Sequence, residues 1–157
     1  MSRSSVPVGA PGAAPVDDPV VDVRGPRFAA WVTSAVLVLA LLLGSGWVVG
    51  AQAVVFAVGA FAGIRRAPYA LLFRVLVAPR LGPVREREPE APLRFAQLVG
   101  LLFAVTGAAG YLLGAPVLGA VATGFALVAA LLNAATGFCL GCELHLLLRR
   151  VLPARTA

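Results

Sequence analysis

The sequence predicts an all-α integral membrane protein, in which a four-helix transmembrane bundle is built from two parallel helical hairpins. Each hairpin is expected to be followed by a short cytoplasmic or interfacial helix. Of the 157 residues, 60% are hydrophobic and only 13% are charged, which is too apolar for an ordinary soluble domain. All 13 basic residues are arginines, and they flank the apolar runs. Arginines in such places set membrane orientation, so we do not expect nucleic acid as a partner.

The first 25 residues are rich in Pro, Gly, Ala and Val. Such a segment buries too little apolar surface to offset the entropy of ordering it, so residues 1–25 are predicted to be a disordered cytoplasmic segment. It lacks the basic start and apolar core of a signal peptide, and we expect the first span to be uncleaved. Residues 26–152 then form the membrane domain, and residues 153–157 form a tail.

The first hairpin comes from two apolar runs, Phe28 to Leu43 and Trp47 to Ile64, which Gly44-Ser45-Gly46 divides. One helix over both runs would be about 55 Å long at a rise of ~1.5 Å per residue. That is nearly twice the ~30 Å thickness of a bilayer's hydrocarbon core. Two spans, at about 28–43 and 47–64, joined by a tight uncharged turn, fit better.

The second hairpin has spans at about 95–113 and 117–136, and Pro116 suits the first turn of its second helix. Between the hairpins, the apolar segment from Pro68 to Pro79 fits either an interfacial helix or an extension of the second span. The two turns carry no charge, whereas the N-terminal segment, the connector and the C-terminal tail hold every arginine. The positive-inside rule therefore places both termini in the cytoplasm.

A weak internal repeat relates the two hairpins. Arg27-Phe28-Ala29 recurs as Arg94-Phe95-Ala96, and each hairpin ends in an apolar segment that starts with a glycine, Gly63 or Gly137. Both copies begin on the same side, so the repeat is parallel, with a pseudo-axis along the membrane normal; coincidence in so apolar a sequence is the alternative. If the repeat holds, Arg65 and Arg66 are equivalent to the cysteine pair and face it across the axis.

The one constellation that can do chemistry follows the fourth span. It contains both cysteines, Cys139 and Cys142, together with Glu143 and the single histidine, His145. The C-x-x-C spacing puts two thiols on one helix face. If Gly137 ends the span and Thr136 caps a new helix, Cys139 lies in its first turn, where the helix dipole lowers the pKa of a thiol. Glu143 opposes that effect, and His145 can supply a compensating charge or shuttle a proton.

Other interpretations of the pair stay open. Two cysteines can be small apolar residues of a buried helix, although a structural disulfide is disfavoured on a reducing cytoplasmic side. A metal needs about four ligands, which one helix cannot close around an ion. We therefore expect no cofactor, with zinc shared between two copies through Cys139 and Cys142 as the alternative. No Ser-His-Asp set, phosphate loop or intramembrane charge occurs, which argues against hydrolases, nucleotide enzymes and proton-driven transporters.

Several motifs together carry a family resemblance. They are Asp22-x-Arg24, Arg27-Phe28, Pro68-Tyr69, Pro92-x-Arg94-Phe95-Ala96 and, most specifically, Asn133-Ala134-x-Thr136-Gly137-Phe138-Cys139-Leu140-Gly141-Cys142-Glu143. Over about residues 20 to 150 the chain resembles domain-of-unknown-function family 4395, a bacterial membrane family with no established activity. Members often appear alongside thioredoxin-like proteins and sulfurtransferases, which implies thiol or sulfur chemistry by association. Relatives tend to have an aromatic residue in place of His145, which argues against a general catalytic role for it.

These observations predict a thiol redox or sulfur-relay component of the bacterial cytoplasmic (inner) membrane. Cys139 is the expected nucleophile and Cys142 the resolving thiol; the supporting residues are Glu143, His145, Arg65 and Arg66. One alternative is a small transporter or channel for a sulfur compound. Another is a non-catalytic anchor that recruits a thioredoxin-like or rhodanese-like sulfurtransferase. The expected partners are the lipid bilayer, such a protein and a second copy of the chain, and whether the protein is an enzyme stays open.

Overall fold

The computed structural model describes residues 20–84 and 86–151, and most of these residues are helical. Three helices are long and apolar enough to cross a membrane, namely α1 (Arg24–Leu43), α4 (Glu90–Leu112) and α5 (Pro116–Thr136). A shorter apolar helix, α2 (Gly46–Ala57), continues as a π-helical turn over Val58–Ala62. The all-α prediction is confirmed, and α1 and α4 begin four to five residues before the spans expected from the sequence, at about 28–43 and 95–113.

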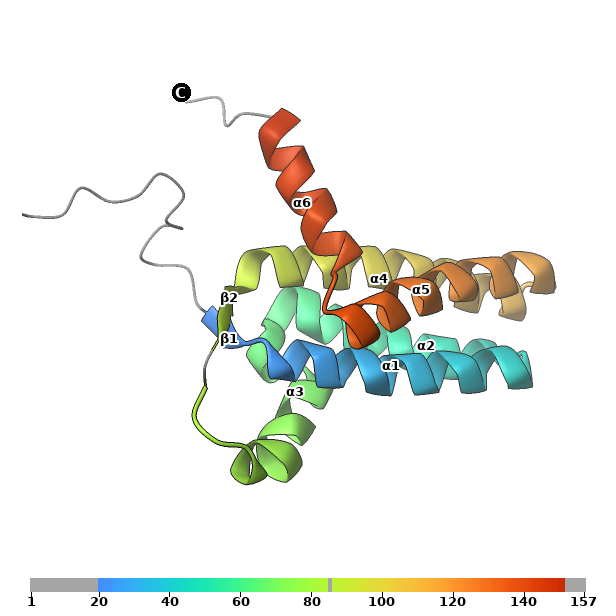
Figure 1. The fold of residues 1–157 in the computed structure, drawn as a ribbon. Coiled ribbons are helices and arrows are strands. Elements are labelled where there is room, and N and C mark those ends of the chain that lie inside the picture. The colour runs from blue at the N-terminus through green and yellow to red at the C-terminus, as the bar shows by residue number, and fades with distance from the viewer. Residues whose placement is uncertain (1–19, 85, 152–157) are drawn as a thin grey trace, which may run out of the picture.

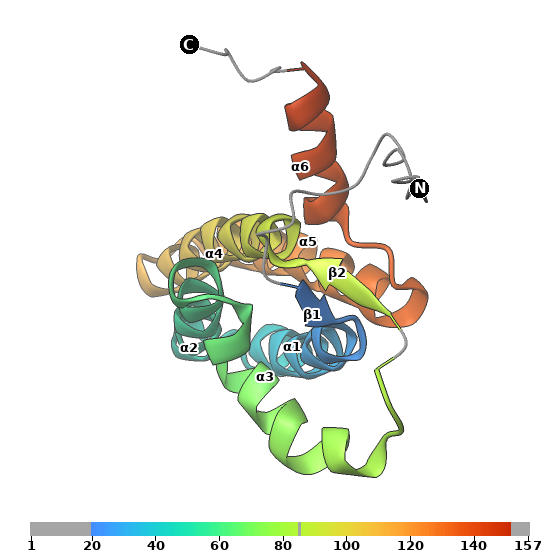
Figure 2. The same cartoon turned by 90° about the vertical axis from the view of Figure 1, so that its left-hand side faces the viewer.

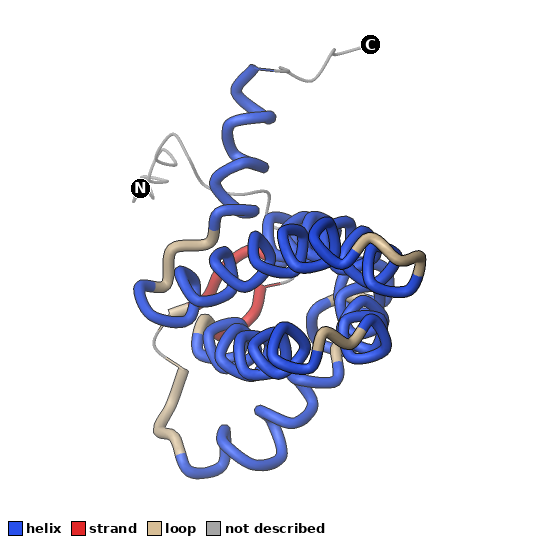
Figure 3. Tube along the Cα trace, turned by 90° about the vertical axis from the view of Figure 1, so that its right-hand side faces the viewer, coloured by secondary structure: helices blue, strands red, loops and turns tan. Residues whose placement is uncertain are grey.

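The four apolar helices lie side by side along one axis (Figure 1), and the end-on views show them surrounding a common centre (Figures 2 and 3). In this ring α2 packs on α4, α4 on α5, α5 on α1, and α1 on α2. Two short turns join the helices at one end of the bundle. Gly44, in the left-handed region at φ 57°, ends α1, and the Ser45 hydroxyl caps α2 by accepting a hydrogen bond from the Val48 N–H at 3.4 Å.

The half of the bundle next to these turns is packed closely by small side chains. Ala40, Val49, Ala53 and Ala104 are buried there in one apolar cluster. A Cβ built on Gly110 would lie only 2.5 Å from the backbone nitrogen of Gly119, so α4 and α5 touch through their backbones. Such contacts need small residues, which let helices approach closely in lipid.

Two helices leave the opposite end of the bundle, steeply inclined to its axis and on opposite sides of it (Figure 2). One is α3 (Pro68–Leu72), which continues through a π-helical turn, Phe73–Val77, and a 3₁₀ turn, Ala78–Arg80. The other is α6 (Leu140–Val151). Gly63, at φ 99°, ends the second apolar helix. The segment from Pro68 to Pro79 therefore turns away from the bundle instead of extending that helix.

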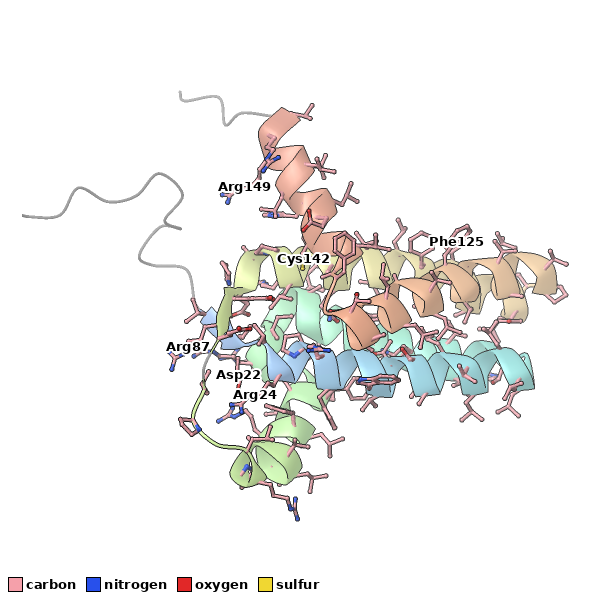
Figure 4. The ribbon with its side chains drawn as sticks, viewed as in Figure 1. Asp22, Arg24, Arg87, Phe125, Cys142 and Arg149 are labelled. Atoms are coloured by element: carbon pink, nitrogen blue, oxygen red, sulfur yellow. The ribbon has the colours of Figure 1, made fainter. Side chains whose placement is uncertain are left out.

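A short antiparallel ribbon links the start of the first hairpin to the start of the second. Its strands are β1 (Val20–Asp22) and β2 (Arg87–Pro89), with Asp22 opposite Arg87. Arg24 forms a salt bridge with Asp22 at 2.8 Å and donates to the Gly82 carbonyl at 3.2 Å. Figure 4 shows Asp22, Arg24 and Arg87 at this end of the bundle.

The ribbon corrects one boundary of the sequence analysis. Disorder was predicted for residues 1–25, but residues 20–25 belong to β1 and the beginning of α1. Strand pairing with residues almost seventy positions away supplies the hydrogen bonds that the local sequence lacks. The remainder of that segment, residues 1–19, and the tail at 153–157 lie outside the described residues.

Two arginines make equivalent contacts in the two hairpins. Arg27, at the start of α1, directs its guanidinium to the carbonyls of Ala134 and Ala135 at the end of α5, each at 3.5 Å. Arg94, at the start of α4, donates to the carbonyls of Ala60 at 2.9 Å and Phe61 at 3.1 Å, at the end of the second apolar helix. A cationic donor there satisfies carbonyls that lack a partner within the helix and complements its dipole.

These contacts follow the repeat seen in the sequence. Arg27 and Arg94 both open an Arg-Phe-Ala triplet. The carbonyls that they contact come three and two residues before Gly137 and Gly63, respectively. Both glycines adopt positive φ, 77° and 99°. Each hairpin therefore supplies the arginine that caps the last helix of the other.

The close approach of α4 and α5 gives a stability prediction. Replacing Gly110 by alanine should destabilise the protein by about 1–3 kcal/mol, because the new methyl group meets backbone that cannot move aside. The measurement is the thermal unfolding midpoint of the purified protein in detergent. Gly124→Ala is the matched control, since a Cβ there meets no heavy atom within 4 Å, and removing a helical glycine gains up to ~1 kcal/mol. Equal midpoints for the two variants would refute the backbone contact.

Candidate functional site

Gly137 ends α5 and directs the chain toward the two thiols. It adopts a left-handed conformation at φ 77°, and its N–H donates to the Asn133 carbonyl at 2.9 Å. Thr136 is the last residue of α5, and its hydroxyl accepts a hydrogen bond from the Phe138 N–H at 3.1 Å. Three residues, Gly137, Phe138 and Cys139, form the turn between α5 and α6, and α6 begins at Leu140.

Cys139 therefore caps α6. Its carbonyl accepts from the Glu143 N–H at 3.0 Å, and its sulfur accepts from the Cys142 N–H at 3.4 Å. The prediction that Thr136 caps this helix and that Cys139 lies in its first turn is wrong, because the left-handed turn at Gly137 delays the helix start. The physical argument survives the shift, since a group at the cap position also lies at the positive end of the helix dipole.

The two sulfurs are 2.6 Å apart, and the Cys142 thiol donates to the Cys139 sulfur. No disulfide joins the two cysteines, and both are half-buried. The bonded distance in a disulfide is about 2.05 Å. The arrangement thus lets one sulfur attack the other after a small movement.

This hydrogen bond separates the acidities of the two thiols. It stabilises the Cys139 thiolate and lowers the pKa of Cys139, although burial and the Glu88 charge on β2 act in the opposite direction. The same bond raises the pKa of Cys142, and burial raises it further, as do the charges of Cys139, Glu88 and Glu143. Cys139 is therefore the more acidic thiol of the pair and carries more thiolate at neutral pH.

The two cysteines also have different surroundings. Cys142 packs against an apolar cluster of Val21, Ile64 and Leu93, and Figure 4 shows it where α6 meets the bundle. Gly141 between them allows α6 to cross α4 closely, since a Cβ there would lie 2.6 Å from the Cα of Ala96. Cys139 instead lines a cavity.

This cavity has a volume of about 630 Å³ and occupies the half of the bundle nearer to the thiols. All four apolar helices contribute to its largely apolar wall, which also includes three polar residues within the helices, Thr33, Gln97 and Asn133. The end of the cavity near the thiols, called its mouth below, is lined by residues of the ribbon, α3 and the start of α6. Its charged and reactive side chains are Asp22, Arg65, Arg74, Arg87 and Cys139.

Of the two supporting arginines, only Arg65 lines the same cavity as a thiol, and neither arginine is hydrogen-bonded to a sulfur among the described residues. Arg65 lines the same cavity as Cys139, and its guanidinium donates to the Val20 carbonyl at 2.8 Å. Arg66 is exposed in the turn before α3. Within residues 20–84 and 86–151, no hydrogen bond joins either arginine to a thiol. The charged groups that act on the thiols are instead the carboxylates of Glu88 and Glu143.

Glu143 and His145 occupy different sides of α6. Glu143 is exposed. The His145 ring packs on Phe95 with 5.4 Å between ring centroids, and its Nδ1 is buried without a partner among the described residues. In that same part of the chain, no three His, Cys, Asp or Glu side chains are grouped to hold a metal ion. The zinc site between two copies stays a prediction.

Two buried polar residues near the cavity were missed from the sequence. Gln52 is 1% exposed; its side chain accepts from the Tyr69 hydroxyl at 2.7 Å and donates to Thr33 at 3.4 Å, linking α2 to α3 and α1. The Glu90 carboxylate accepts from the Ile64 N–H at 2.8 Å, next to Gly63. The sequence signals for them are an isolated amide in a charge-free run, at Gln52, and an acidic residue at the start of a span, at Glu90.

One protein family model matches almost the entire described part of this chain. The family model described as domain of unknown function (DUF4395) matches residues 21–150, a range that contains all of the ribbon except Val20, both hairpins and both cysteines. No curated protein and no solved structure matches the chain. The match confirms the resemblance found in the motifs, and the chain belongs to the DUF4395 family.

Proposed function

We propose that this protein is a membrane thiol redox or sulfur-relay component that works through Cys139 and Cys142. The observation that carries the proposal is the 2.6 Å sulfur pair in which Cys142 donates to Cys139. Such a pair contains an acidic thiol that can attack and a second thiol that can resolve the product. The lowered pKa of Cys139 and its place on the cavity wall support its role as the nucleophile.

The exchange chemistry needs only these two residues and a partner. The Cys139 thiolate attacks one sulfur of a partner disulfide, so that a mixed disulfide forms and the partner's other sulfur leaves as a thiolate. Cys142 then loses its proton and attacks the Cys139 sulfur, which releases the partner as a dithiol and leaves a Cys139–Cys142 disulfide. The reverse sequence reduces that disulfide at the expense of a partner dithiol. In a sulfur relay, the Cys139 thiolate instead attacks the outer sulfur of a partner persulfide; the partner cysteine leaves as a thiolate, and a persulfide forms on Cys139.

The bundle crosses the bacterial cytoplasmic membrane four times, with both termini and the thiols on the cytoplasmic side. Three long apolar helices support this arrangement, together with the shorter run Gly46–Ala62, whose length of about 25 Å is close to that of a ~30 Å hydrocarbon core. The turns at the far end carry no charge, while Arg27, Arg65 and Arg94 lie at the thiol end. That asymmetry is what the positive-inside rule expects.

Helix α6 lies on the membrane surface in this arrangement. Leu140, Leu144, Leu147, Leu148 and Val151 follow helical spacing along one stripe, and all five are exposed. Arg150 falls beside the stripe, and Arg149 lies on the opposite face of the helix. An amphipathic helix with arginines outside its apolar face is suited to the boundary between lipid headgroups and acyl chains. The same leucines are what the alternative function, an anchor for a thioredoxin-like or sulfurtransferase protein, would use.

The cavity is the observation that favours the other alternative, a transporter for a sulfur compound. Its wall is largely apolar, and a polar sulfur compound would find few hydrogen-bonding partners there. The cavity also stops at the closely packed half of the bundle, where Val49 and Ala104 are fully buried. Thiol exchange therefore ranks above transport.

The orientation predicts which positions react from outside the cell. In a Cys139→Ser/Cys142→Ser background, cysteines introduced at Ser45 and Ala115 should react with a membrane-impermeant maleimide in intact cells. A cysteine introduced at Glu88 should react only after the membrane is permeabilised, because β2 lies at the opposite end of the bundle. Labelling of position 88 in intact cells would reverse the topology.

The division of roles predicts an asymmetry in trapping. Cys142→Ser should accumulate mixed disulfides or persulfides on Cys139, because no resolving thiol remains to release them. Cys139→Ser should trap at least tenfold less, since the remaining thiol packs in the apolar cluster and has a raised pKa. Non-reducing gels and mass spectrometry of the captured partner give the comparison. Equal, background-level trapping in both variants and in the double variant would assign the cysteines a structural role.

The thiol pair also predicts opposite shifts in the pH dependence of alkylation at Cys139. Cys142→Ala removes the hydrogen bond that lowers the pKa of Cys139, so the midpoint of the rate profile should move to higher pH. Glu88→Gln removes a negative charge that raises this pKa, so its midpoint should move to lower pH. Stopped-flow alkylation of the purified protein measures both. Midpoints that move in the same direction would contradict the assignment of these two influences.

A further inference from the structure

The bundle is open in the half nearer to the thiols, and this opening has the size of a ligand site. Protein interiors are normally filled by side chains, yet a cavity of about 630 Å³ remains between the four helices. Small-molecule sites typically measure about 300–1,000 Å³. Ala129 and Ala130 line the cavity where larger residues would fill it, and Gly100 leaves room for the Phe56 ring, which a Cβ there would meet at 3.0 Å. The volume is thus the consequence of small side chains at specific positions.

Aromatic side chains border the cavity, with Phe56 buried and Phe125 61% exposed on the outer side of α5, and they suit a flat apolar ring. Phe56, Phe103 and Phe125 line the cavity from three different helices, and the rings of Phe103 and Phe125 are paired at a centroid distance of 6.0 Å. Aromatic faces and edges pack favourably against another planar ring. Figure 4 shows Phe125 on α5, some distance along the bundle from Cys142.

Two polar groups on the wall are free to bind such a ring. The amides of Gln97 on α4 and Asn133 on α5 line the cavity, and neither has a side-chain hydrogen bond to another described residue. A side-chain amide carries two N–H donors. Within an apolar wall, they are best matched by a ligand with carbonyl oxygens.

A reactive sulfur and a cation complete the site at its mouth. Cys139 and Arg65 both line the cavity, at equivalent places two residues after Gly137 and Gly63. The only hydrogen bond of the Arg65 guanidinium among the described residues goes to the Val20 carbonyl, and a guanidinium has five N–H donors. The remaining donors can stabilise an oxygen that gains negative charge during a reaction.

We propose that this cavity binds a lipophilic quinone and that the Cys139–Cys142 dithiol reduces it. The inference rests on the proposed thiol function and names its membrane electron acceptor. A quinone is a flat apolar ring with two carbonyl oxygens, and it accepts two electrons, which is the number that a dithiol gives up. It also reaches the site from the bilayer, into which its tail partitions.

The reaction balances in two steps. The Cys139 thiolate adds to a ring carbon, which forms a carbon–sulfur bond and leaves negative charge on a quinone oxygen. The Cys142 thiolate then attacks the Cys139 sulfur; the S–S bond forms, the carbon–sulfur bond breaks, and its electron pair returns to the ring. The two thiol protons end on the two oxygens, so that dithiol plus quinone gives disulfide plus hydroquinone. A partner dithiol regenerates the site by exchange.

The test uses the purified full chain, reduced and freed of reductant, with decylubiquinone as the probe. Quinone absorbance and the count of free thiols are followed together, and binding is measured by isothermal titration calorimetry. We expect one quinone reduced for each two thiols lost. Cys139→Ser should bind the quinone but reduce none of it.

Substitutions in the cavity wall test whether the quinone is bound and reduced inside the cavity. Ala129→Phe should weaken binding and slow reduction at least tenfold, because the ring fills the space. Val128→Phe is its matched control, since the neighbouring Val128 side chain is 61% exposed and is not part of the cavity wall. If Ala129→Phe does not fold, Asn133→Leu keeps the side-chain size, removes the amide and should weaken binding in the same direction.

The outcomes separate this inference from the proposed function. Reduction at an unchanged rate in well-folded Ala129→Phe and Asn133→Leu would place the quinone elsewhere and overturn the proposal. Quinone binding without loss of thiols would overturn it as well, as would a cavity that binds only phospholipid. If quinone is neither bound nor reduced while Cys142→Ser still traps partners, the quinone proposal fails and the thiol function stands. If Cys142→Ser also traps no partner, both the quinone proposal and the proposed thiol function fail.

Discussion

The exchange of arginines between the two hairpins is the constraint on which the rest of this structure depends. Arg27 reaches the carbonyls at the end of α5, and Arg94 reaches those at the end of the second apolar helix. In an apolar bundle, free helix-end carbonyls are costly, so each hairpin needs the other to complete its own end. The glycines that follow can then turn the chain sharply, and α3 and α6 leave on opposite sides. Cys139 caps α6 at the mouth of the cavity because Gly137 sets the point of exit.

The bundle is closely packed over one half of its length and encloses a cavity in the other. Near the turns, glycines bring backbones into contact and small buried residues leave no space; near the thiols the same helices surround a cavity. Association of helices in lipid depends on close packing, so the packed half can hold the helices together while the other half stays open. The Gln52 network and the Glu90–Ile64 hydrogen bond replace packing at the open end. A bundle that was open along its full length would lack this support.

The features that could be predicted from the sequence are those that depend on residues close together in the chain. Apolar run length, uncharged turns and Gly137 at the end of a span gave the helices, and the C-x-x-C spacing gave the thiol pair. The ribbon was missed because Val20–Asp22 and Arg87–Pro89 acquire strand structure only from each other. The start of α6 was misplaced because a left-handed glycine consumes residues before the next helix can begin. The cavity could not be predicted at all, since an empty volume depends on how four helices pack and not on any motif. The roles of Glu90 and Gln52 could not be predicted either, because their hydrogen-bond partners are distant in the sequence.

The repeat also explains how a symmetric frame produces an asymmetric site. Two residues after the helix-ending glycine, one half of the chain has Arg65 and the other has Cys139, and both side chains line the cavity. The two similar hairpins place these positions at matching points of the fold without any additional helix or strand. Substitution at one position can then provide a nucleophile while the other keeps a cation. A reaction in which sulfur gives up electrons and an oxygen gains them requires unlike groups on the two sides of the ligand. Equivalent positions that carry unlike residues meet that requirement, whereas two cysteines or two arginines would not.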